Sequence, residues 1–448
     1  MARRFRHVLD DQGPTAALAL LGPRLPDSLV AVDAVRIEAL AQAGRIVEAH
    51  ALLAEVTDRV CDVDDRVCVA LAHAACDPLS VLAARHEIEL LLAAVAVSDP
   101  TALLLRTALA EGYAFSTTPE AAVPHLDILF DHLAQLDYSW SARVHQARRE
   151  HLAAVGAGAD QQGIFYAGIV EMAARARTDR DRMPLQRAIL GDLYQAGDLN
   201  AFAAVLGDYR RIAESTASTA DIWCGKAMVA AMALVRDPLD VVMTRIDEAQ
   251  QYGAAYGHHS AAETADAQLV VALLAHGQLG DVADMVDERT KGQNAVAWRA
   301  IAAVALALAG RNTAAAAAIA DVRGAGFATM GHDWLRRPAL ALAAHTAYLL
   351  NDRDAARELL PLLAASGVET IAIGNSIANL GPTSRYIGLL HATTGDLELA
   401  ASGLAAASSL AKRMRSPTYE ARCSAELSTL EQAPQRRGAS APAVSVKH

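Results

Sequence analysis

Two short stretches of this sequence combine aromatic and guanidinium side chains in a way that suits an acidic or aromatic ligand. Trp334 is followed by Arg336 and Arg337, and Arg385 is followed by Tyr386. A guanidinium can form two parallel hydrogen bonds to a carboxylate, and it also stacks on aromatic faces. These five residues are therefore our candidate partner-binding residues. Alternatively, the charges of Arg336 and Arg337 complement the carbonyl end of another helix. The alternative for Arg385 is a structural role in capping the fold.

Residue patterns that indicate catalysis or metal binding are missing from the sequence. There is no GxSxG elbow and no GxxxxGK[ST] phosphate loop. His258 and His259 are adjacent, so on a helix they would diverge by about 100°. Cys61, Cys68 and Cys76 lack the CxxC spacing of zinc sites. We predict a protein that is not an enzyme and that has no cofactor and no metal.

Single aromatic and thiol side chains have a packing interpretation beside the functional one. Cys224, next to Trp223, is the best candidate for a reactive thiol, but its apolar surroundings favour an inert buried cysteine. Trp140, Trp223 and Trp298, together with Trp334, could line a ligand groove. Their places near expected helix starts favour packing between neighbouring helical hairpins.

The composition favours helices. Hydrophobic residues make up 53% of the 448 residues, whereas aromatic residues make up only 4%. Alanine and leucine supply most of the apolar content, and both are strong helix formers. The β-branched and aromatic enrichment that is typical of strands is missing.

Charge and cysteine content restrict the class of partner and the compartment. The net charge is −11, with 40 basic against 51 acidic residues, so we expect no direct binding of nucleic acid, which needs basic side chains on phosphates. Five scattered cysteines indicate a reducing cytoplasm and not a disulfide framework. Asp10, Asp11 and Pro14 interrupt the N-terminal stretch, so we expect no signal peptide. No apolar run reaches the roughly 20 residues of a membrane span.

An internal repeat supplies the elements that would position these side chains. A short turn centred on Gly or Asn recurs between apolar segments, in the middle of the chain at intervals of about 40 residues. A left-handed Gly or Asn ends a helix and reverses the chain. Degenerate turns carry Cys76-Asp77-Pro78, Thr117-Thr118-Pro119, Gly156-Ala157-Gly158 and Arg236-Asp237-Pro238. The clear turns are Ala43-Gly44-Arg45, Ala196-Gly197-Asp198, His276-Gly277-Gln278, Ala309-Gly310-Arg311, Asn351-Asp352-Arg353 and Thr394-Gly395-Asp396.

The segments after four of the turns repeat a small residue followed by two apolar ones on a single helix face. The sets are Ala49, Leu53 and Val56; Ala315, Ile319 and Val322; Ala356, Leu360 and Leu363; and Ala400, Leu404 and Ala407. This pattern resembles the second helix of the tetratricopeptide repeat, and Ile387-Gly388 lies where that family has its Leu-Gly pair. Most repeat intervals exceed the 34 residues of that family, so we expect longer helices.

A more specific resemblance covers roughly residues 158–430. The segment Gly381–Ala392, the turn that follows it and Arg415–Arg422 are similar to the C-terminal repeat region of large actinobacterial regulators. Those regulators carry an ATPase module, often with a cyclase-like domain in front or a LuxR-type helix-turn-helix behind. The phosphate loop is missing here, so the resemblance implies only the sensory or docking half of such a regulator.

These observations predict one all-α domain: a right-handed α-solenoid superhelix of about ten tetratricopeptide-like helical hairpins. Residues 1–30 are expected to form an N-terminal capping segment, residues 31–432 the helical-repeat domain, and residues 433–448 a disordered C-terminal tail.

The leading functional hypothesis is a protein-interaction module in bacterial signalling or transcriptional regulation. It would bind a partner protein or peptide through its concave surface. The alternative is a sensor that holds a small molecule or peptide signal in the solenoid interior. An enzyme on a helical scaffold is a third hypothesis, which would need several titratable groups that converge in one pocket. Self-association stays open.

Overall fold

The computed structural model describes residues 2–25, 28–76, 80–155, 159–258, 260–291, 296–324, 326–327, 335–374 and 376–439. Over these residues the chain is all-α apart from one β-hairpin and four short 3-10 helices, which confirms the predicted all-α class. The helices in the first half are α1 (Ala2–Gln12), α2 (Pro14–Leu21), α3 (Val30–Gln42), α4 (Ile46–Thr57), α5 (Val63–Cys76), α6 (Arg85–Ala94), α7 (Pro100–Ala114), α8 (Val123–Asp131), α9 (Tyr138–Val155), α10 (Ala159–Arg175), α11 (Asp179–Ala196) and α12 (Leu199–Ser215). In the second half they are α13 (Thr219–Arg236), α14 (Leu239–Ala255), α15 (Ala261–Ala275), α16 (Ala283–Thr290), α17 (Val296–Leu308), α18 (Asn312–Gly324), α19 (Arg336–Leu350), α20 (Arg353–Ala364), α21 (Thr383–Thr394), α22 (Leu397–Met414) and α23 (Pro417–Ala439), with β1 (Thr370–Ile373) and β2 (Ala378–Pro382) between α20 and α21.

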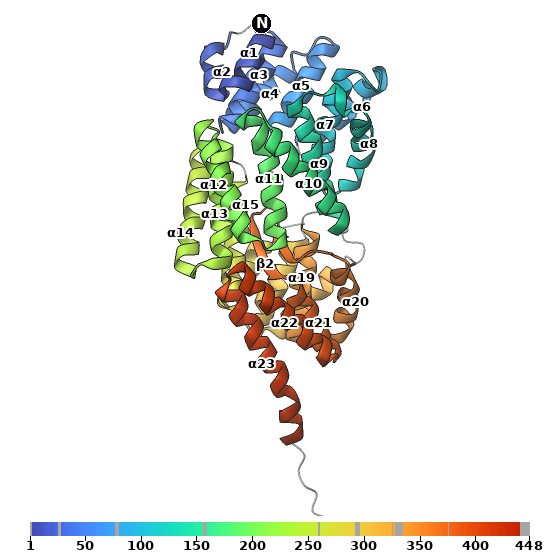
Figure 1. The fold of residues 1–448 in the computed structure, drawn as a ribbon, viewed down its shortest axis with the longest axis vertical. Coiled ribbons are helices and arrows are strands. Elements are labelled where there is room, and N and C mark those ends of the chain that lie inside the picture. The colour runs from blue at the N-terminus through green and yellow to red at the C-terminus, as the bar shows by residue number, and fades with distance from the viewer. Residues whose placement is uncertain are drawn as a thin grey trace, which may run out of the picture.

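The helices pack mainly on their neighbours in sequence and on the next helix but one. In Figure 1 the chain runs from α1 at one end of the long axis to α23 at the other. Helices α1 and α2 pack on α3, in the region where we expected a capping segment. At the other end, α23 continues to Ala439, and residues 440–448 lie outside the described residues.

The predicted turns end helices as expected. Gly44, Gly197, Gly277, Gly310 and Gly395 all have positive φ, and so does Asn351 at 53°. Beyond two of these turns, Asp198 and Asp352 accept hydrogen bonds from the first amides of α12 and α20, which is how an N-cap begins a helix. Of the degenerate turns, Asp77 and Pro78 after Cys76, and Gly156-Ala157-Gly158, lie outside the described residues.

The repeated small-then-apolar positions are buried as predicted, except that Leu360 is only partly buried. Helices α21 and α22 approach each other closely at two glycines. A Cβ atom on Gly403 would lie 3.0 Å from the Cα atom of Gly388, and one on Gly388 would lie 3.1 Å from the Ala400 carbonyl oxygen. A side chain at either position would push the helices apart. The glycine of the Ile387-Gly388 pair therefore allows α21 and α22 to pack closely.

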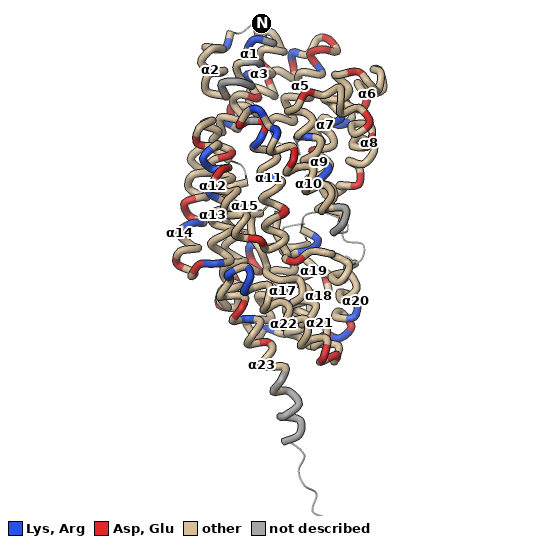
Figure 2. The backbone as a smooth tube through the Cα atoms, in the orientation of Figure 1, with Lys and Arg blue, Asp and Glu red and all other residues tan. Residues whose placement is uncertain are grey.

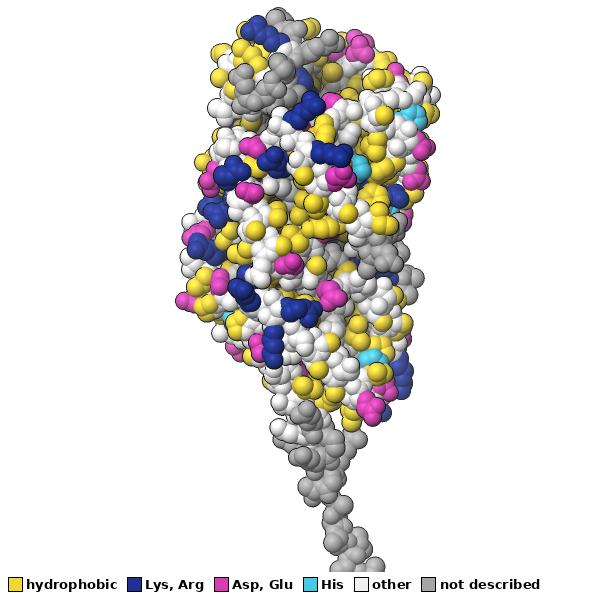
Figure 3. All heavy atoms as spheres, in the orientation of Figure 1, with side chains coloured by type: hydrophobic (Ala, Val, Ile, Leu, Met, Phe, Trp, Pro, Cys, Tyr) yellow, Lys and Arg dark blue, Asp and Glu magenta, His cyan; other side chains and the backbone are white. Residues whose placement is uncertain are grey.

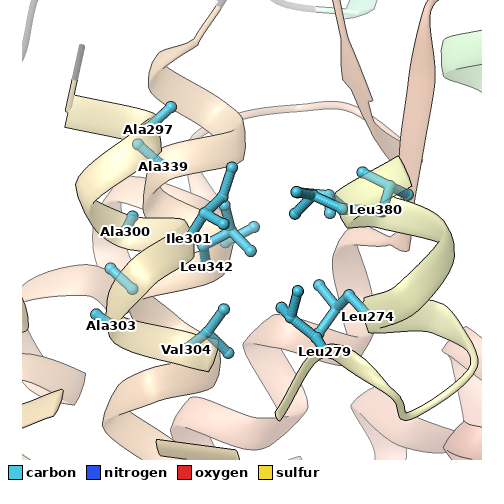
Figure 4. Close-up of a cluster of buried hydrophobic side chains, with 14 of the residues drawn as sticks. Leu274, Leu279, Ala297, Ala300, Ile301, Ala303, Val304, Ala339, Leu342 and Leu380 are labelled. Atoms are coloured by element: carbon cyan, nitrogen blue, oxygen red, sulfur yellow. The ribbon is translucent and has the colours of Figure 1, made fainter. Parts of the chain in front are cut away.

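The largest apolar cluster runs from α13 to α21 (Figure 4). Ala297, Ala300 and Ala303 of α17 are buried beside α19, where Ala339 lies next to Ala297. Such small side chains let two helix backbones come close, and larger residues such as Ile301 and Leu342 fill the space toward Leu274 and Leu380. Alanine therefore sets the helix spacing here, and the larger leucine and isoleucine side chains fill the space between the helices.

The β-hairpin is an element that the sequence analysis missed. Its strands are antiparallel, with Ala372 opposite Asn379 and Ile373 opposite Ala378. All but one of their residues are buried. The strands contact α11, α13, α15, α19 and α22. Helices that precede the hairpin in the sequence and one that follows it therefore surround it. The run of Thr370, Ile371 and Ile373 before Gly374 was a strand-and-turn signal that could have located it.

Buried polar side chains hold the hairpin to helices that are far away in sequence. Thr370 Oγ1 donates to the carbonyl oxygens of Tyr194 and Gln195 at 3.1 and 3.0 Å, across 176 and 175 residues. Gln268 Nε2 donates to the carbonyl oxygens of Ala227 and Ile377 at 2.9 and 2.8 Å. These bonds join the hairpin to α11 through Thr370 and to α15 through Gln268, which also binds α13.

Contacts between segments that lie so far apart recur along the chain. Arg236 Nε donates to the carbonyl oxygen of Met414 at 3.0 Å, across 178 residues. Near the N-terminus, a methyl group on Gly44 would collide with Thr219, and one on Gly13 would lie 3.4 Å from the Thr216 carbonyl oxygen. In an open repeat array each hairpin contacts only its neighbours. The described residues depart from that expectation, because distant parts of the array lie directly against one another.

Basic and acidic residues alternate over the outer helices (Figure 2). On the face in Figure 3, hydrophobic side chains lie between charges of both signs. Among the described residues, no helix is long and apolar enough to cross a lipid bilayer.

Candidate functional site

Arg385 and Tyr386 lie inside the protein and not on a binding surface. Both open α21, and neither exposes more than 1% of its surface. The Arg385 guanidinium forms a two-pronged ion pair with Glu426 of α23, with Nε 2.9 Å from Oε2 and Nη2 2.5 Å from Oε1. It also stacks on the Tyr386 ring at 5.0 Å. Of the two alternatives for Arg385, the structure therefore favours the fold-capping role.

The surroundings of this ion pair form a buried polar core between α19, α21 and α23. Burial opposes the charge on Arg385, but Glu426 outweighs it and raises the pKa of Arg385. Arg422 lies on the other side of Glu426, with Nε 3.8 Å from Oε1, and its Nη1 donates to the Leu274 carbonyl at 2.6 Å. Burial, together with Arg385 and Arg422, lowers the pKa of His345 well below its usual value. Several titratable groups do converge here, but they bind one another.

The buried His345 should make stability depend on pH. Its Nε2 atom lies 3.4 Å from Arg385 Nη2 and accepts from it only as a neutral ring. The unfolded chain binds a proton at about pH 6.5 whereas the folded chain does not. The stabilisation is therefore complete above pH 6.5 and is lost progressively as the pH falls below it. We expect urea unfolding of His345→Gln to depend less steeply on pH between 6.5 and 5.

The exposed His86 of α6 supplies the control for this measurement. His86→Gln should keep the slope of the wild-type protein. An unchanged slope in His345→Gln would show that His345 is protonated in the folded state. That result would contradict the expectation that two neighbouring guanidinium groups keep its ring neutral.

The other predicted group lies at the start of α19. Trp334 is outside the described residues, whereas Arg336 and Arg337 are the first two residues of this helix and are half-buried. The Nη2 atom of Arg337 is buried and has no hydrogen-bond partner among the described residues. Burial, together with the charges of Arg149 and Arg336, lowers the pKa of Arg337 to about 10. No carboxylate of the described residues contributes to that shift.

Arg149, on α9, brings a third guanidinium to this place. It is 4% exposed, and its Nε and Nη2 atoms each lie 2.8 Å from Asp192 Oδ1. Its Nη1 atom donates to Glu150 at 2.9 Å. Asp192 and Glu150 outweigh the effect of burial and raise the pKa of Arg149. Arg149 is thus compensated by two carboxylates, in contrast to Arg337.

A fourth arginine, Arg187 of α11, lies within electrostatic reach of Glu150. Its charge also acts on Cys224, and Tyr209 donates to Asp221 at 2.7 Å beside it. Arg187 and Cys224 are both only partly buried, and burial raises the pKa of Cys224. The sequence analysis missed this set, since nothing in the spacing of Arg149, Arg187 and Arg337 relates them.

The cysteines should react with alkylating agents in a fixed order. Burial raises the pKa of both Cys224 and Cys423 to about 11, so at pH 8 only about one thiol in a thousand is ionised. Cys61 is exposed. We expect iodoacetamide to modify Cys61 first in the native protein and to leave Cys423 unmodified until urea unfolds the chain, as peptide mass spectrometry would record. Early modification of Cys423 would contradict its burial.

The remaining candidates are packing residues. Trp223 is buried and stacks on His258 with ring centroids 3.7 Å apart, and Trp298 is packed against the largest apolar cluster. The Arg143 guanidinium lies over the ring of Trp140 at 4.0 Å. His259 lies outside the described residues. Among the residues that the structure describes, no three His, Cys, Asp or Glu side chains are grouped so that they could hold a metal ion.

No protein-family model matches this chain, and no curated protein matches it significantly. The resemblances to the tetratricopeptide repeat and to actinobacterial regulators therefore remain predictions from the sequence.

Proposed function

We propose that this chain is a non-catalytic helical-repeat binding protein of the tetratricopeptide kind, which senses a small molecule or short peptide signal in the interior of its superhelix. It would serve bacterial signalling or transcriptional regulation in the cytoplasm. The observation that carries the proposal is the recurrence of contacts across 176 to 185 residues. We interpret that interval as one superhelical turn, so that successive turns touch.

Touching turns favour the sensor over the docking module. An extended peptide needs an open groove along the concave face, whereas here the hairpin of β1 and β2 fills the axis among α11, α13, α15 and α19. Half-buried charged side chains, including Arg187 of α11 and Arg337 of α19, lie on helices that contact the hairpin. Concave sites with a few polar groups suit small ligands. Five free cysteines agree with a reducing compartment.

The titratable clusters argue for binding and not for catalysis. Arg385 and Glu426 bind each other, and Tyr209 and Asp221 do the same. A catalytic acid or base must reach the substrate proton. These groups are instead occupied by partners within the fold.

The test is native purification followed by mass spectrometry of whatever the protein retains, and then hydrogen exchange with and without the retained molecule. We expect a stoichiometric small molecule or peptide that slows exchange in α9, α11 and α19. The proposal is wrong if the protein holds no such molecule and instead retains a stoichiometric protein that protects the outer surface.

That outcome would support a second candidate function, docking of a partner protein at the N-terminal end. Leu20, Leu25 and Leu29 are 41, 69 and 67% exposed around the connection from α2 to α3. Terminal hairpins of repeat proteins usually carry a polar outer face, and exposed apolar groups of this kind mark interaction surfaces.

A further inference from the structure

We propose that helix α23 is an acid-released latch: protonation of His345 on α19 breaks the contacts that hold α23 to the other helices, and α23 then detaches. The latch responds to protons alone, so it does not depend on the ligand proposed above. Two features of the molecule carry it, namely the way in which α23 is attached and the set of groups that surrounds His345.

Helix α23 is attached through few apolar side chains. Of its residues whose burial the structure describes, Tyr419 and Cys423 are the hydrophobic ones that are buried. Arg422 donates to the Leu274 carbonyl oxygen of α15 at 2.6 Å, and Glu426 forms the ion pair with α21. These four residues of α23 have the spacing of a single helix face, and the C-terminal part of α23 extends beyond the other helices (Figure 1). The attachment of α23 therefore depends on its polar contacts.

His345 lies directly behind the ion pair of Arg385 and Glu426. It is 2% exposed, and its Nε2 atom lies 3.4 Å from Arg385 Nη2, from which a neutral ring accepts a hydrogen bond. Its Nδ1 atom is buried and has no hydrogen-bond partner among the described residues. A proton on Nε2 would therefore point at the N–H groups of Arg385 and would have no acceptor there. The guanidinium must then move, and its two-pronged contact with Glu426 is lost.

The charges in this core make a protonated His345 costly. Arg385 and Arg422 both lie against the single carboxylate of Glu426, so one positive charge is already uncompensated. Protonation of His345 would raise that excess to two charges in a buried place. Detachment of α23 opens the core to water, which screens these charges. Protonation thus favours the detached state.

Titratable groups on the other elements that pack on α19 do not offset this charge. These elements are α17, α18, α20 and β1, and β1 contains no titratable residue. Arg299 of α17 is half-buried, Arg323 of α18 is paired with Glu358 of α20, and the remaining charged residues of α18 and α20 are exposed. Burial raises the pKa of the neighbouring Tyr348 and Tyr386, which stay neutral.

The direction of the pH dependence follows from these surroundings. Burial and the two guanidinium groups hold the pKa of His345 well below its usual value in the closed state, whereas a histidine in water titrates at about pH 6.5. Attachment of α23 is therefore unaffected above pH 6.5 and weakens as the pH falls below it. Since release takes up one proton, the detached fraction should rise by at most about tenfold for each pH unit.

Hydrogen exchange of the full-length protein at pH 7, 6 and 5, followed by peptide mass spectrometry, tests the latch. After correction for the intrinsic pH dependence of exchange, we expect the rate in α23 to rise several-fold from pH 6 to pH 5, up to about tenfold. Peptides from the distant helices α3 and α7 should not change. An unchanged rate in α23 would overturn the proposal, and so would an equal rise in α3 and α7, because the whole chain would then respond.

Substitution of His345 assigns the response. His345→Gln keeps an acceptor for Arg385 but takes up no proton in this range, so the corrected rate in α23 should be the same at pH 6 and pH 5. His345→Asn serves the same purpose if the glutamine variant does not fold. His86→Gln, on the exposed face of α6, should keep the wild-type response. If the His345 variant also keeps that response, His345 does not control α23 and the proposal is wrong.

Discussion

Glu426→Gln is expected to lower the free energy of unfolding by roughly 3 to 5 kcal/mol, because it leaves the Arg385 charge in the core without its counter-charge. The Arg385 side chain is 1% exposed, and that of Glu426 is 14% exposed. Little solvent can therefore screen the uncompensated guanidinium. Arg422 would add a second cation at the same place, since it too lies against Glu426. Urea unfolding followed by circular dichroism measures the change.

The double variant Arg385→Met/Glu426→Leu distinguishes the loss of a counter-charge from the loss of packing. Well-packed apolar replacements of a buried ion pair are often neutral or stabilising, so the double variant should regain most of the stability that Glu426→Gln loses. If the double variant is as unstable as the single one, the ion pair is not the cause. The exposed pair of Arg245 and Glu248 provides a control, because removing Glu248 should cost less than about 1 kcal/mol.

Gly381→Ala is expected to cost roughly 2 to 4 kcal/mol, from two sources that add. Gly381 lies in β2 with φ at +92°, a conformation that an L side chain rarely adopts. A Cβ atom there would also lie 2.7 Å from the ring of Tyr419. That ring cannot move freely, because Tyr419 donates to the carbonyl oxygen of Asn379 at 2.6 Å.

Gly367→Ala separates the two sources. Gly367 also has a positive φ, of 64°, but a Cβ atom there would meet nothing within 4 Å. Its substitution should cost only the backbone strain, about 1 to 2 kcal/mol. Equal losses in the two variants, measured by thermal unfolding, would show that Tyr419 does not confine Gly381.

The sequence predicted the regular part of this fold well. Turns such as those at Gly197 and Asn351 were readable because left-handed backbone limits the residue types that fit. Buried positions such as Ala400 and Leu404 were readable because a helix face has a fixed period. Both patterns depend only on residues that are near in the sequence, so the tertiary structure does not alter them.

The candidate site was far less predictable. Arg385 and Arg337 have the same local signature, an arginine beside an aromatic or a second arginine near a helix start. The partners that separate them come from elsewhere: Glu426 neutralises Arg385, whereas Arg149 opposes Arg337. No spacing rule connects residues that meet only because distant helices come together.

The hydrogen bonds that join Arg236 to Met414 and Thr370 to Tyr194 also decide how the chain folds and unfolds. A repeat array held only by neighbouring hairpins melts piecemeal and folds fast, since its contacts are local. Here the C-terminal helices must pack against α11 and α13 before these long-range contacts can form. The loops closed by these contacts are long, so folding should be slow and contact order high. Loss of α22 and α23 should then loosen α11 as well, and the array should unfold as one cooperative unit.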